Sequence, residues 1–518
     1  MIRHLAPKEA RDWLARPGER AFLDLREAGP FSMGHPLFAT PCAFTTLELR
    51  IGELAPRLSV PILLIDAGDG VSERAAAALA RAGYDDLTIV AGGTPAWRAA
   101  GLTLFEGVNV PSKVLGELVE ARLHPPTITA EKLAAWRAEG REVRVFDCRP
   151  ADEFARMTIP GATWLPNAEL PHRLAALELD GPIVLTCAGR TRGLLGTAAL
   201  RRVAPGVEVL ALENGTQGWA LAGHPLERGR APNKLPTLDE DQRQVSRARA
   251  DALLGEACIP LATAGDVARL VAQETRSTFL FDLRSVGEAG ADPLPGFRVV
   301  PAVQLAQATD AYCAVRSARL VLADDTGLRG AITALWLRAL GYEVHVARVD
   351  DALRDLAVPP APVPELATTA TTMTAAGALL AAQGGRGRLV DLRSSAAFRE
   401  GHVAGAIWSC RAALPALERA GTSLMLVDGG DGRAANAARD LGGAVAVAGG
   451  MAALRDAGAA VETGGLPRLR DREDVTWFAH GRHDGDMEAS RTYLRWETGL
   501  LARLSEDEHA AFDLSAIS

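Results

Sequence analysis

Residues 184–196 read VLTCAGRTRGLLG, an apolar stretch that runs into one cysteine and two arginines before a second apolar stretch begins. The first part is typical of a buried strand, and the continuation after Gly193 has the spacing of a helix. Cys187 is therefore expected at the carboxyl end of a strand, where open α/β sheets bind their ligands. This strand–loop–helix segment is the first candidate site in the chain.

The residues that follow Cys187 are suited to activating its thiol. We expect the backbone N–H groups of residues 188–193 to surround the sulfur at a helix N-terminus, which favours an anion and lowers the pKa of a cysteine. Arg190 and Arg192 add positive charge and donors for an oxyanion, and the small residues before them let the backbone approach. The alternative is that Cys187 is a small buried apolar residue, as we expect of the five other cysteines.

The pattern occurs four times along the chain. A strand that ends in Asp-Leu-Arg or Asp-Cys-Arg reaches its aspartate at Asp24, Asp147, Asp282 and Asp391. The next strand ends at Asp66, Cys187, Asp324 and Asp428, with closely similar spacing. A third marker closes three of the units at 91–102, 213–226 and 448–459, and has decayed in the third unit. Markers that share a period indicate repeated domains.

Short strands rich in Val, Ile and Leu alternate with Ala- and Leu-rich helices in every unit. This predicts the α/β fold class, with a central parallel sheet flanked by helices in each domain. We predict four tandem domains, at 1–107, 128–230, 258–357 and 368–466, and a helical tail at 467–518. Polar or Pro-rich joints lie at 108–127, 231–257 and 357–368.

The loop CAGRTRG, the upstream stretch FDCRPADEFARMTIPGA and the downstream stretch ENGTQGWALAGHPLERG resemble the rhodanese family of sulfurtransferases. The second domain matches closely, the first and fourth more loosely, and the third least. The resemblance implies a loop cysteine that takes a sulfane sulfur from thiosulfate or a mercaptopyruvate-like donor and holds it as a persulfide. This cysteine is expected to pass the sulfur to cyanide, a small thiol or a thioredoxin-like protein, and no cofactor or metal is expected. The implied catalytic residue is Cys187, and the implied substrate-binding residues are Ala188, Gly189, Arg190, Thr191, Arg192 and Gly193.

The resemblance also guides two further expectations. Related dual-specificity phosphatases use Cys-x5-Arg, whereas Cys187 and Arg192 are spaced as Cys-x4-Arg, so sulfur transfer is favoured over phosphatase activity. Two-domain members of the family typically carry an inactive domain before the active one. We therefore expect the first domain to pair with the second and to form one wall of the site around Cys187, with the third and fourth as a second pair.

An aspartate cannot form a persulfide, so the domains that carry Asp66, Asp324 and Asp428 are predicted to be inactive. We expect each carboxylate to accept the backbone N–H groups that the thiolate uses in the second domain. The alternative, that these aspartates are catalytic acids or metal ligands, lacks a nearby histidine or second paired carboxylate. Whether these domains have a structural or a binding role stays open.

Other polar residues receive an architectural interpretation. Asp147 and Arg149 have counterparts in every unit, which indicates an ion pair at a strand end, and Cys148 replaces a leucine of the other units and is expected to pack in the core. In the tail, the sequence predicts an amphipathic helix over 487–504. Just before that helix, four residues resemble metal ligands but are better interpreted as a polar turn, namely His480, His483, Asp484 and Asp486.

Composition limits the classes of function. The chain has 518 residues, a net charge of −8 and no basic block, which argues against nucleic acid as a partner. No apolar run is long enough to span a bilayer, and six scattered cysteines and a charged N-terminus indicate a cytoplasmic protein with reduced thiols. The leading hypothesis is a sulfurtransferase that uses Cys187. The alternative is a non-enzymatic scaffold in which Cys187 senses oxidants or sulfide, and the oligomeric state is left open.

Overall fold

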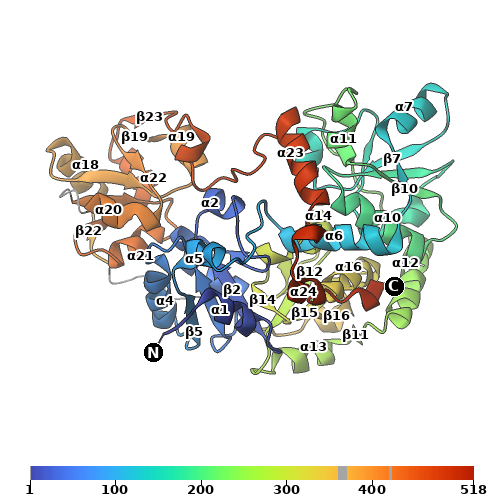
Figure 1. The fold of residues 1–518 in the computed structure, drawn as a ribbon, viewed down its shortest axis with the longest axis horizontal. Helices are drawn as coiled ribbons and strands as arrows, with labels where there is room; N and C mark the ends of the chain where they lie inside the picture. The colour runs from blue at the N-terminus through green and yellow to red at the C-terminus, as the bar shows by residue number, and fades with distance from the viewer. Residues whose placement is uncertain (1, 360–369, 419–422, 518) are drawn as a thin grey trace. The chain divides into compact units, whose positions relative to one another are not determined.

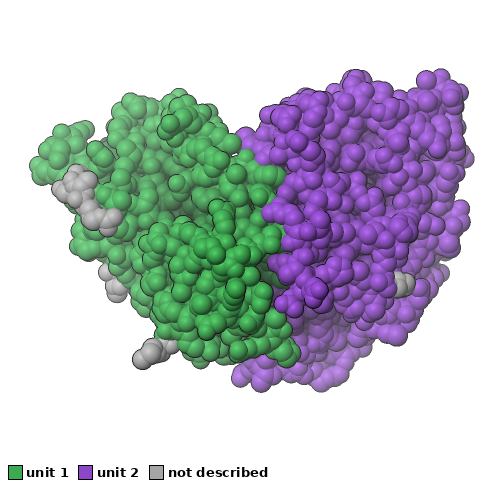
Figure 2. Space-filling model, viewed as in Figure 1, with its two compact units in different colours: residues 1–108, 313–315, 361–478 green, residues 109–312, 316–360, 479–518 purple. Residues whose placement is uncertain are grey.

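The computed structural model describes residues 2–359, 370–418 and 423–517. The parts of the fourth predicted domain and its joint at 360–369 and 419–422 lie outside the described residues. The chain forms two compact units, which Figure 2 colours separately: residues 1–108, 313–315 and 361–478, and residues 109–312, 316–360 and 479–518. The first predicted domain thus shares its unit with the fourth, and the second shares its unit with the third. The expected pairing of the first domain with the second is wrong.

Four parallel sheets repeat one strand order. Figure 1 labels several of their strands and the helices around them. In the first, β1 (Arg3–Leu5), β5 (Leu87–Val90), β4 (Ile62–Ile65) and β2 (Arg20–Asp24) lie side by side, and β3 (Thr40–Pro41) pairs with β2. The second runs β6 (Thr127–Ile128), β10 (Val209–Leu212), β9 (Ile183–Thr186), β7 (Arg144–Asp147) and β8 (Thr163–Trp164). The third runs β11 (Leu261–Ala262), β16 (Glu343–Arg348), β15 (Arg319–Asp324), β12 (Thr278–Asp282) and β13 (Arg298–Val299). The fourth runs β17 (Thr372–Met373), β22 (Ala444–Val447), β21 (Leu424–Val427), β18 (Arg388–Asp391) and β20 (Ile407–Trp408).

Helices flank these sheets, and the α/β prediction is confirmed. In the first unit they are α1 (Pro7–Leu14), α2 (Ala28–Ser32), α3 (Leu47–Leu54), α4 (Val71–Arg81), α5 (Gly93–Ala99), α18 (Ala375–Gln383), α19 (Ser395–Glu400), α20 (Leu414–Glu418), α21 (Arg433–Arg439) and α22 (Gly450–Asp456). In the second they are α6 (Val110–Leu123), α7 (Ala130–Ala138), α8 (Ala151–Arg156), α9 (Glu169–Arg173), α10 (Thr191–Val203), α11 (Gly215–Leu221), α12 (Glu240–Glu256), α13 (Ala264–Val271), α14 (Val286–Ala291), α15 (Ala302–Gln307), α16 (Leu328–Ala339), α17 (Asp351–Arg354), α23 (Met487–Thr498) and α24 (Glu506–Ala510).

The first sequence marker forms the same ion pair in all four sheets. Arg149 donates Nε and Nη2 to the two carboxylate oxygens of Asp147 at 2.9 and 2.7 Å, and both residues are fully buried. The matching pairs are Asp24–Arg26, Asp282–Arg284 and Asp391–Arg393. Each arginine lies two residues after its aspartate, so two N–H groups of its guanidinium reach back to the carboxylate at the end of the strand. The architectural interpretation of these residues is confirmed.

Two of the predicted joints contain helices that pack on the domains. α6 packs against α10, and α12 packs against both α9 of the second domain and α16 of the third. This packing by α12, together with the direct contact of α9 with α16, holds the second and third domains in one unit. The tail helix α23 begins at Met487 as predicted but ends at Thr498, before Gly499, and so is shorter than expected.

Among the described residues, every helix is too short or too polar to cross a bilayer.

Candidate active site

Cys187 lies at the end of β9 and before α10, as predicted, and only 2% of its surface is exposed. The start of α11 holds the loop, because the Thr216 N–H donates to the Cys187 carbonyl oxygen at 2.7 Å and the Gln217 N–H donates to that of Ala188 at 3.1 Å. Gly215 has a φ of +54°, and a Cβ there would lie 2.2 Å from the Cys187 oxygen. The third sequence marker is therefore the glycine-bearing turn that seats the loop.

Several groups act on the sulfur and lower the pKa of Cys187 to about 7. The largest contribution is a hydrogen bond from the Cys148 thiol; burial opposes it, and the Arg192 charge and the Gly193 N–H assist it. The Thr186 carbonyl oxygen, 3.0 Å from Cys148 Sγ, competes for the same thiol proton, so the Cys148 contribution is shared between two acceptors. The lowered pKa has the expected direction, and above about pH 7 the sulfur is mainly a thiolate.

Cys148 is buried, as expected of a packing residue, but its neighbour was not foreseen. It follows β7 just as Cys187 follows β9, and these two strands are adjacent. The burial of Cys148 and the charge of its neighbour raise its pKa well above the ordinary value. The sequence held a signal for this pair, because Cys148 lies within the Asp-Cys-Arg marker and Cys187 stands at the second marker. Only the adjacency of β7 and β9 shows that the two cysteines are neighbours.

The two loop arginines are both paired with carboxylates. Arg190 Nε lies 2.8 Å from Glu117 Oε1, and its Nη2 also contacts Glu120. Arg192 makes a two-pronged contact with Glu153, at 2.7 and 2.8 Å. The expected open cationic loop is thus largely compensated. Arg190 ties the loop to α6, and Arg192 remains the arginine whose charge favours the thiolate.

Helix α6, from the first joint, lies directly against the loop. A Cβ on Gly116 would lie 2.8 Å from Thr191 Cγ2, so glycine permits this close approach. Lys113 of α6 is 6% exposed, and no carboxylate within the described part of the chain lies in ion-pair distance of its ammonium group. Burial lowers the pKa of Lys113, while the charges of Glu497 and Cys187 act in the opposite direction. A buried ammonium group therefore interacts through its charge with the sulfur.

Helix α23, from the tail, covers the same loop. Thr191 Oγ1 donates to Glu497 Oε1 at 2.8 Å, and Glu497 is fully buried. The second oxygen of Glu497 is buried without a hydrogen-bond partner among the described residues. A Cβ on Gly189 would lie 2.8 Å from that oxygen and 3.0 Å from the Tyr493 ring. Sequence reasoning missed Lys113 and Glu497 because they lie outside the repeats; the one available signal was charge within apolar helical stretches.

In the first and fourth domains the loop aspartate binds its own loop. Asp66 accepts the N–H groups of Gly68 and Ser72 at 2.8 Å each, and Asp428 accepts those of Gly430, Gly432 and Ala434 at 2.9, 3.1 and 3.1 Å. The carboxylate therefore satisfies donors that are free at the start of a helix. The predicted occupation of these N–H groups is confirmed.

Comparison with known proteins agrees with this geometry. The Rhodanese-like domain model matches residues 6–100 and 129–222. The crystal structure of a thiosulfate sulfurtransferase from Pseudomonas aeruginosa is 35% identical, with a TM-score of 0.88 and 99% of each chain covered. The chain belongs to the rhodanese family. A sulfurtransferase of Allochromatium vinosum is 31% identical over 99 residues, which is 19% of this chain and 92% of that protein. An HTH-type transcriptional regulator of Mycobacterium tuberculosis is 40% identical over 93 residues, 18% of this chain and only 41% of the regulator.

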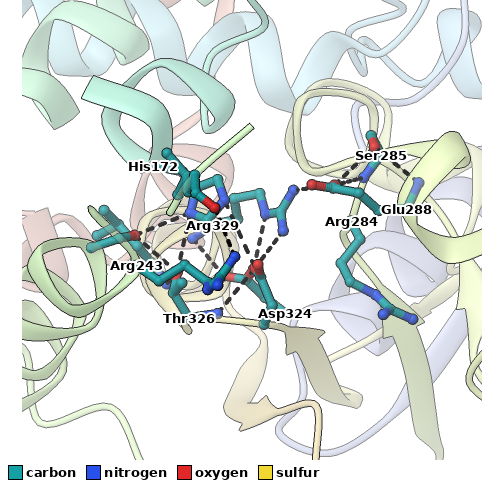
Figure 3. Close-up of polar contacts among 12 residues, drawn as sticks. His172, Arg243, Arg284, Ser285, Glu288, Asp324, Thr326 and Arg329 are labelled. Carbon is teal, nitrogen blue, oxygen red and sulfur yellow. Dashed lines mark hydrogen bonds and ion pairs between the residues drawn. The ribbon is translucent and has the colours of Figure 1, made fainter. Parts of the chain in front are cut away.

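The third rhodanese-like domain uses its loop in another way. Arg329, at the loop position of Arg192, is fully buried and donates to Asp324 at 2.8 Å. It also contacts Glu288 at 2.8 Å (Figure 3). Two further carboxylates pair with it, Glu169 at 2.9 Å and the neighbouring Asp325. Because Glu169 lies on α9 of the second rhodanese domain, this loop joins the two domains of the unit.

A possible metal cluster was not foreseen at the same place. His172, Asp324 and Asp325 bring ligand atoms within 4.8 Å of one another, so the expectation that no histidine or second carboxylate stands near these aspartates is wrong for Asp324. The histidine comes from α9, far away in sequence. Arg329 already pairs with both carboxylates, so its guanidinium group supplies the positive charge that a metal ion would otherwise supply. The donor set therefore fits an interdomain ion-pair network better than a metal ion.

The residues before α23 form the polar turn that the sequence predicted. Within 480–486, Gly481 and Gly485 have φ values of +86° and +95°. Asp484 pairs with Arg156 of α8 at 2.6 Å, which attaches the turn to the second rhodanese domain.

Proposed function

We propose that this rhodanese moves a sulfane sulfur from thiosulfate, or a similar small donor, to a thiol or cyanide acceptor through a persulfide on Cys187. The observation that carries the proposal is a buried cysteine at a helix N-terminus whose pKa is lowered to about 7. The other three domains hold carboxylates at that position, and a carboxylate cannot carry sulfane sulfur. A cytoplasmic location, with a small thiol or thioredoxin-like acceptor, is part of the same proposal.

The proposed reaction has two displacement steps. The Cys187 thiolate attacks the outer sulfur of thiosulfate, the S–S bond of the donor breaks, and sulfite leaves. The persulfide then gives its outer sulfur to the acceptor nucleophile, and the Cys187 thiolate is restored. The thiolate is the reactive form in the first step, so a pKa near neutrality favours the reaction at physiological pH.

The surrounding side chains support different parts of this reaction. We assign the Gly193 N–H and Arg192 to stabilising the sulfur anion, and the remaining loop residues, Ala188, Gly189 and Thr191, to shaping the donor site. Arg190 is held by two carboxylates, so it positions the loop on α6. Lys113 has no ion-pair partner within the described residues and is the best placed cation for the donor's sulfonate. Because Cys187 is almost fully covered, α23 must shift to admit the donor.

Mass spectrometry of the intact protein tests the proposal. After treatment with thiosulfate and removal of the excess, we expect the chain to gain the mass of one sulfur atom, which peptide mapping places on Cys187. Added cyanide should remove that mass and release thiocyanate. A protein that gains no sulfur at Cys187 from thiosulfate or from inorganic polysulfide would rule out the sulfurtransferase function.

The two loop arginines should affect the thiol differently. Arg192→Gln removes a charge that favours the thiolate, so the pKa of Cys187 should rise by about one unit and alkylation at pH 7 should slow. Arg190→Gln should leave the midpoint of the pH profile near 7. The measurement is the rate of iodoacetamide labelling of Cys187 against pH, read by peptide mass.

A matched control separates charge from structure in that experiment. The double variant Arg192→Gln/Glu153→Gln removes both members of the pair, so its midpoint should move less than that of Arg192→Gln alone. Equal shifts in the Arg190 and Arg192 variants would contradict the assignment of the two residues.

A second candidate function is oxidant sensing. The neighbouring register positions of Cys148 and Cys187 favour it, because a sulfenic acid formed on Cys187 by peroxide has a thiol on the adjacent strand. A disulfide formed with peroxide, together with no sulfur gain from any donor, would support sensing in place of transfer.

A further inference from the structure

The second rhodanese domain places two thiols side by side at the ends of adjacent strands. β7 and β9 are parallel, Asp147 pairs with Thr186, and the Cys148 N–H donates to the Thr186 oxygen at 2.9 Å. Cys148 and Cys187 are the next residues in this register, so their side chains leave the same face of the sheet. Neighbouring strands lie about 4.8 Å apart. This spacing falls within the Cα separation of about 4.4–6.8 Å that a disulfide bond accepts.

The two thiols also influence each other, because Cys148 lowers the pKa of Cys187 and Cys187 raises that of Cys148. Both residues are free cysteines, and the Cys148 thiol donates to the Thr186 carbonyl oxygen at 3.0 Å. Both are also buried, Cys148 completely, so an external acceptor meets the Cys187 sulfur only after local opening. Cys148 is thus a thiol at the neighbouring register position to any persulfide formed on Cys187.

The other domains show that the register does not itself require a thiol. Leu25, Leu283 and Leu392 occupy the position of Cys148, and each N–H donates to the residue before the loop aspartate, at 2.9, 2.9 and 2.8 Å. The same backbone contact therefore exists in all four sheets. Leucine stands opposite each carboxylate, and cysteine stands opposite the one loop thiol.

We propose that Cys148 resolves the Cys187 persulfide by forming a disulfide with Cys187 and releasing hydrosulfide. Cys148 sulfur attacks the inner sulfur of the persulfide, a Cys148–Cys187 bond forms, and the bond between the inner and outer sulfurs breaks. The Cys148 proton goes to the outgoing sulfur, which leaves as hydrosulfide. The sulfane sulfur is reduced to sulfide and two thiols are oxidised, so no external oxidant is consumed.

This second activity rests on the proposed function, and it adds a requirement. Each catalytic turnover that ends in the disulfide leaves the site unable to accept sulfur until a dithiol reductant restores both thiols. The protein then releases sulfide with a dithiol reductant as the electron source. Transfer to cyanide becomes the competing branch, which is favoured when the acceptor reaches the persulfide first.

The test follows the full-length protein after loading. Protein treated with thiosulfate, or with inorganic polysulfide as a direct sulfur source, is freed of donor and incubated without acceptor. We expect the added sulfur mass to decay, one sulfide to appear per loaded site, and a Cys148–Cys187 cross-linked peptide to form. In Cys148→Ala the persulfide should last about tenfold longer or more, because an adjacent nucleophile has been removed. Cys42→Ala, which removes a buried thiol of the first domain, should decay like the wild type.

The outcomes separate the two proposals. A Cys187 persulfide that is equally stable in wild type and Cys148→Ala overturns the resolving role and leaves sulfur transfer intact. Absence of any sulfur on Cys187 overturns sulfur transfer and the resolving step with it. If Cys148→Ala does not fold, peptide mapping of unreduced wild-type protein decides the matter, since the cross-linked peptide must accompany sulfide release.

Discussion

Replacing Cys187 by serine should abolish sulfur transfer from thiosulfate while leaving the fold intact. A serine hydroxyl is not ionised at neutral pH and cannot hold a sulfane sulfur as a persulfide. Loss of a nucleophile costs orders of magnitude, so turnover should fall by at least about 10³-fold. The measurement is thiocyanate formation from thiosulfate and cyanide, with circular dichroism to verify the fold.

The matched control lies in the first domain. Asp66→Asn alters the residue at the same loop position, keeps an acceptor for one of its two N–H donors, and should leave turnover near that of the wild type. Wild-type turnover in Cys187→Ser would show that another thiol performs the reaction, and a large loss in Asp66→Asn would show that the first domain takes part in it.

The largest effect on stability is expected from Arg329→Met. Arg329 is fully buried and pairs with Asp324, Asp325, Glu169 and Glu288, so the variant leaves these carboxylates without their shared cation. Breaking a buried pair in this way costs about 3–5 kcal/mol. Hydrogen exchange of peptides from β15 and α16 should show a decrease of this size in the free energy of opening.

The effect of pH has a definite sign. In the wild type, burial opposes ionisation of Asp324, but the Arg329 charge outweighs it and lowers the pKa of that carboxyl. Stability from this pair is therefore present near pH 7 and is lost as the pH falls through the lowered pKa. In Arg329→Met the carboxylates repel, their pKa values rise, and protonation relieves the repulsion. The difference between wild type and variant should hence shrink from pH 7 to pH 5.

An exposed pair in the same domain provides the control. Arg269 contacts Asp266 one turn away on α13, and its side chain is largely exposed. Arg269→Met should leave opening of the third domain unchanged, because surface ion pairs contribute little. An equal loss in both variants would mean that the buried network is no stronger than a surface pair.

The sequence by itself determined the repeated fold and the position of the candidate thiol. Strand-end markers such as Asp147–Arg149 identify the domains because a buried strand, its closing ion pair and the following loop are all local in sequence. Cys187 was identified in the same way, since a thiol between an apolar strand and a helix is a local pattern. The loop aspartates were likewise understood, because their partners are N–H groups a few residues away.

Tertiary structure decided everything that depends on contacts between distant segments. Strand adjacency made Cys148 a neighbour of Cys187. Lys113 and Glu497 lie near the loop on helices from outside the repeats. Arg190 is paired with a carboxylate of α6. The third domain joined the second because α12 packs on both and α9 contacts α16 directly. Burial and ion pairing set the charge and reactivity of these groups, and both depend on which surfaces meet after folding, a property that no single stretch of sequence carries.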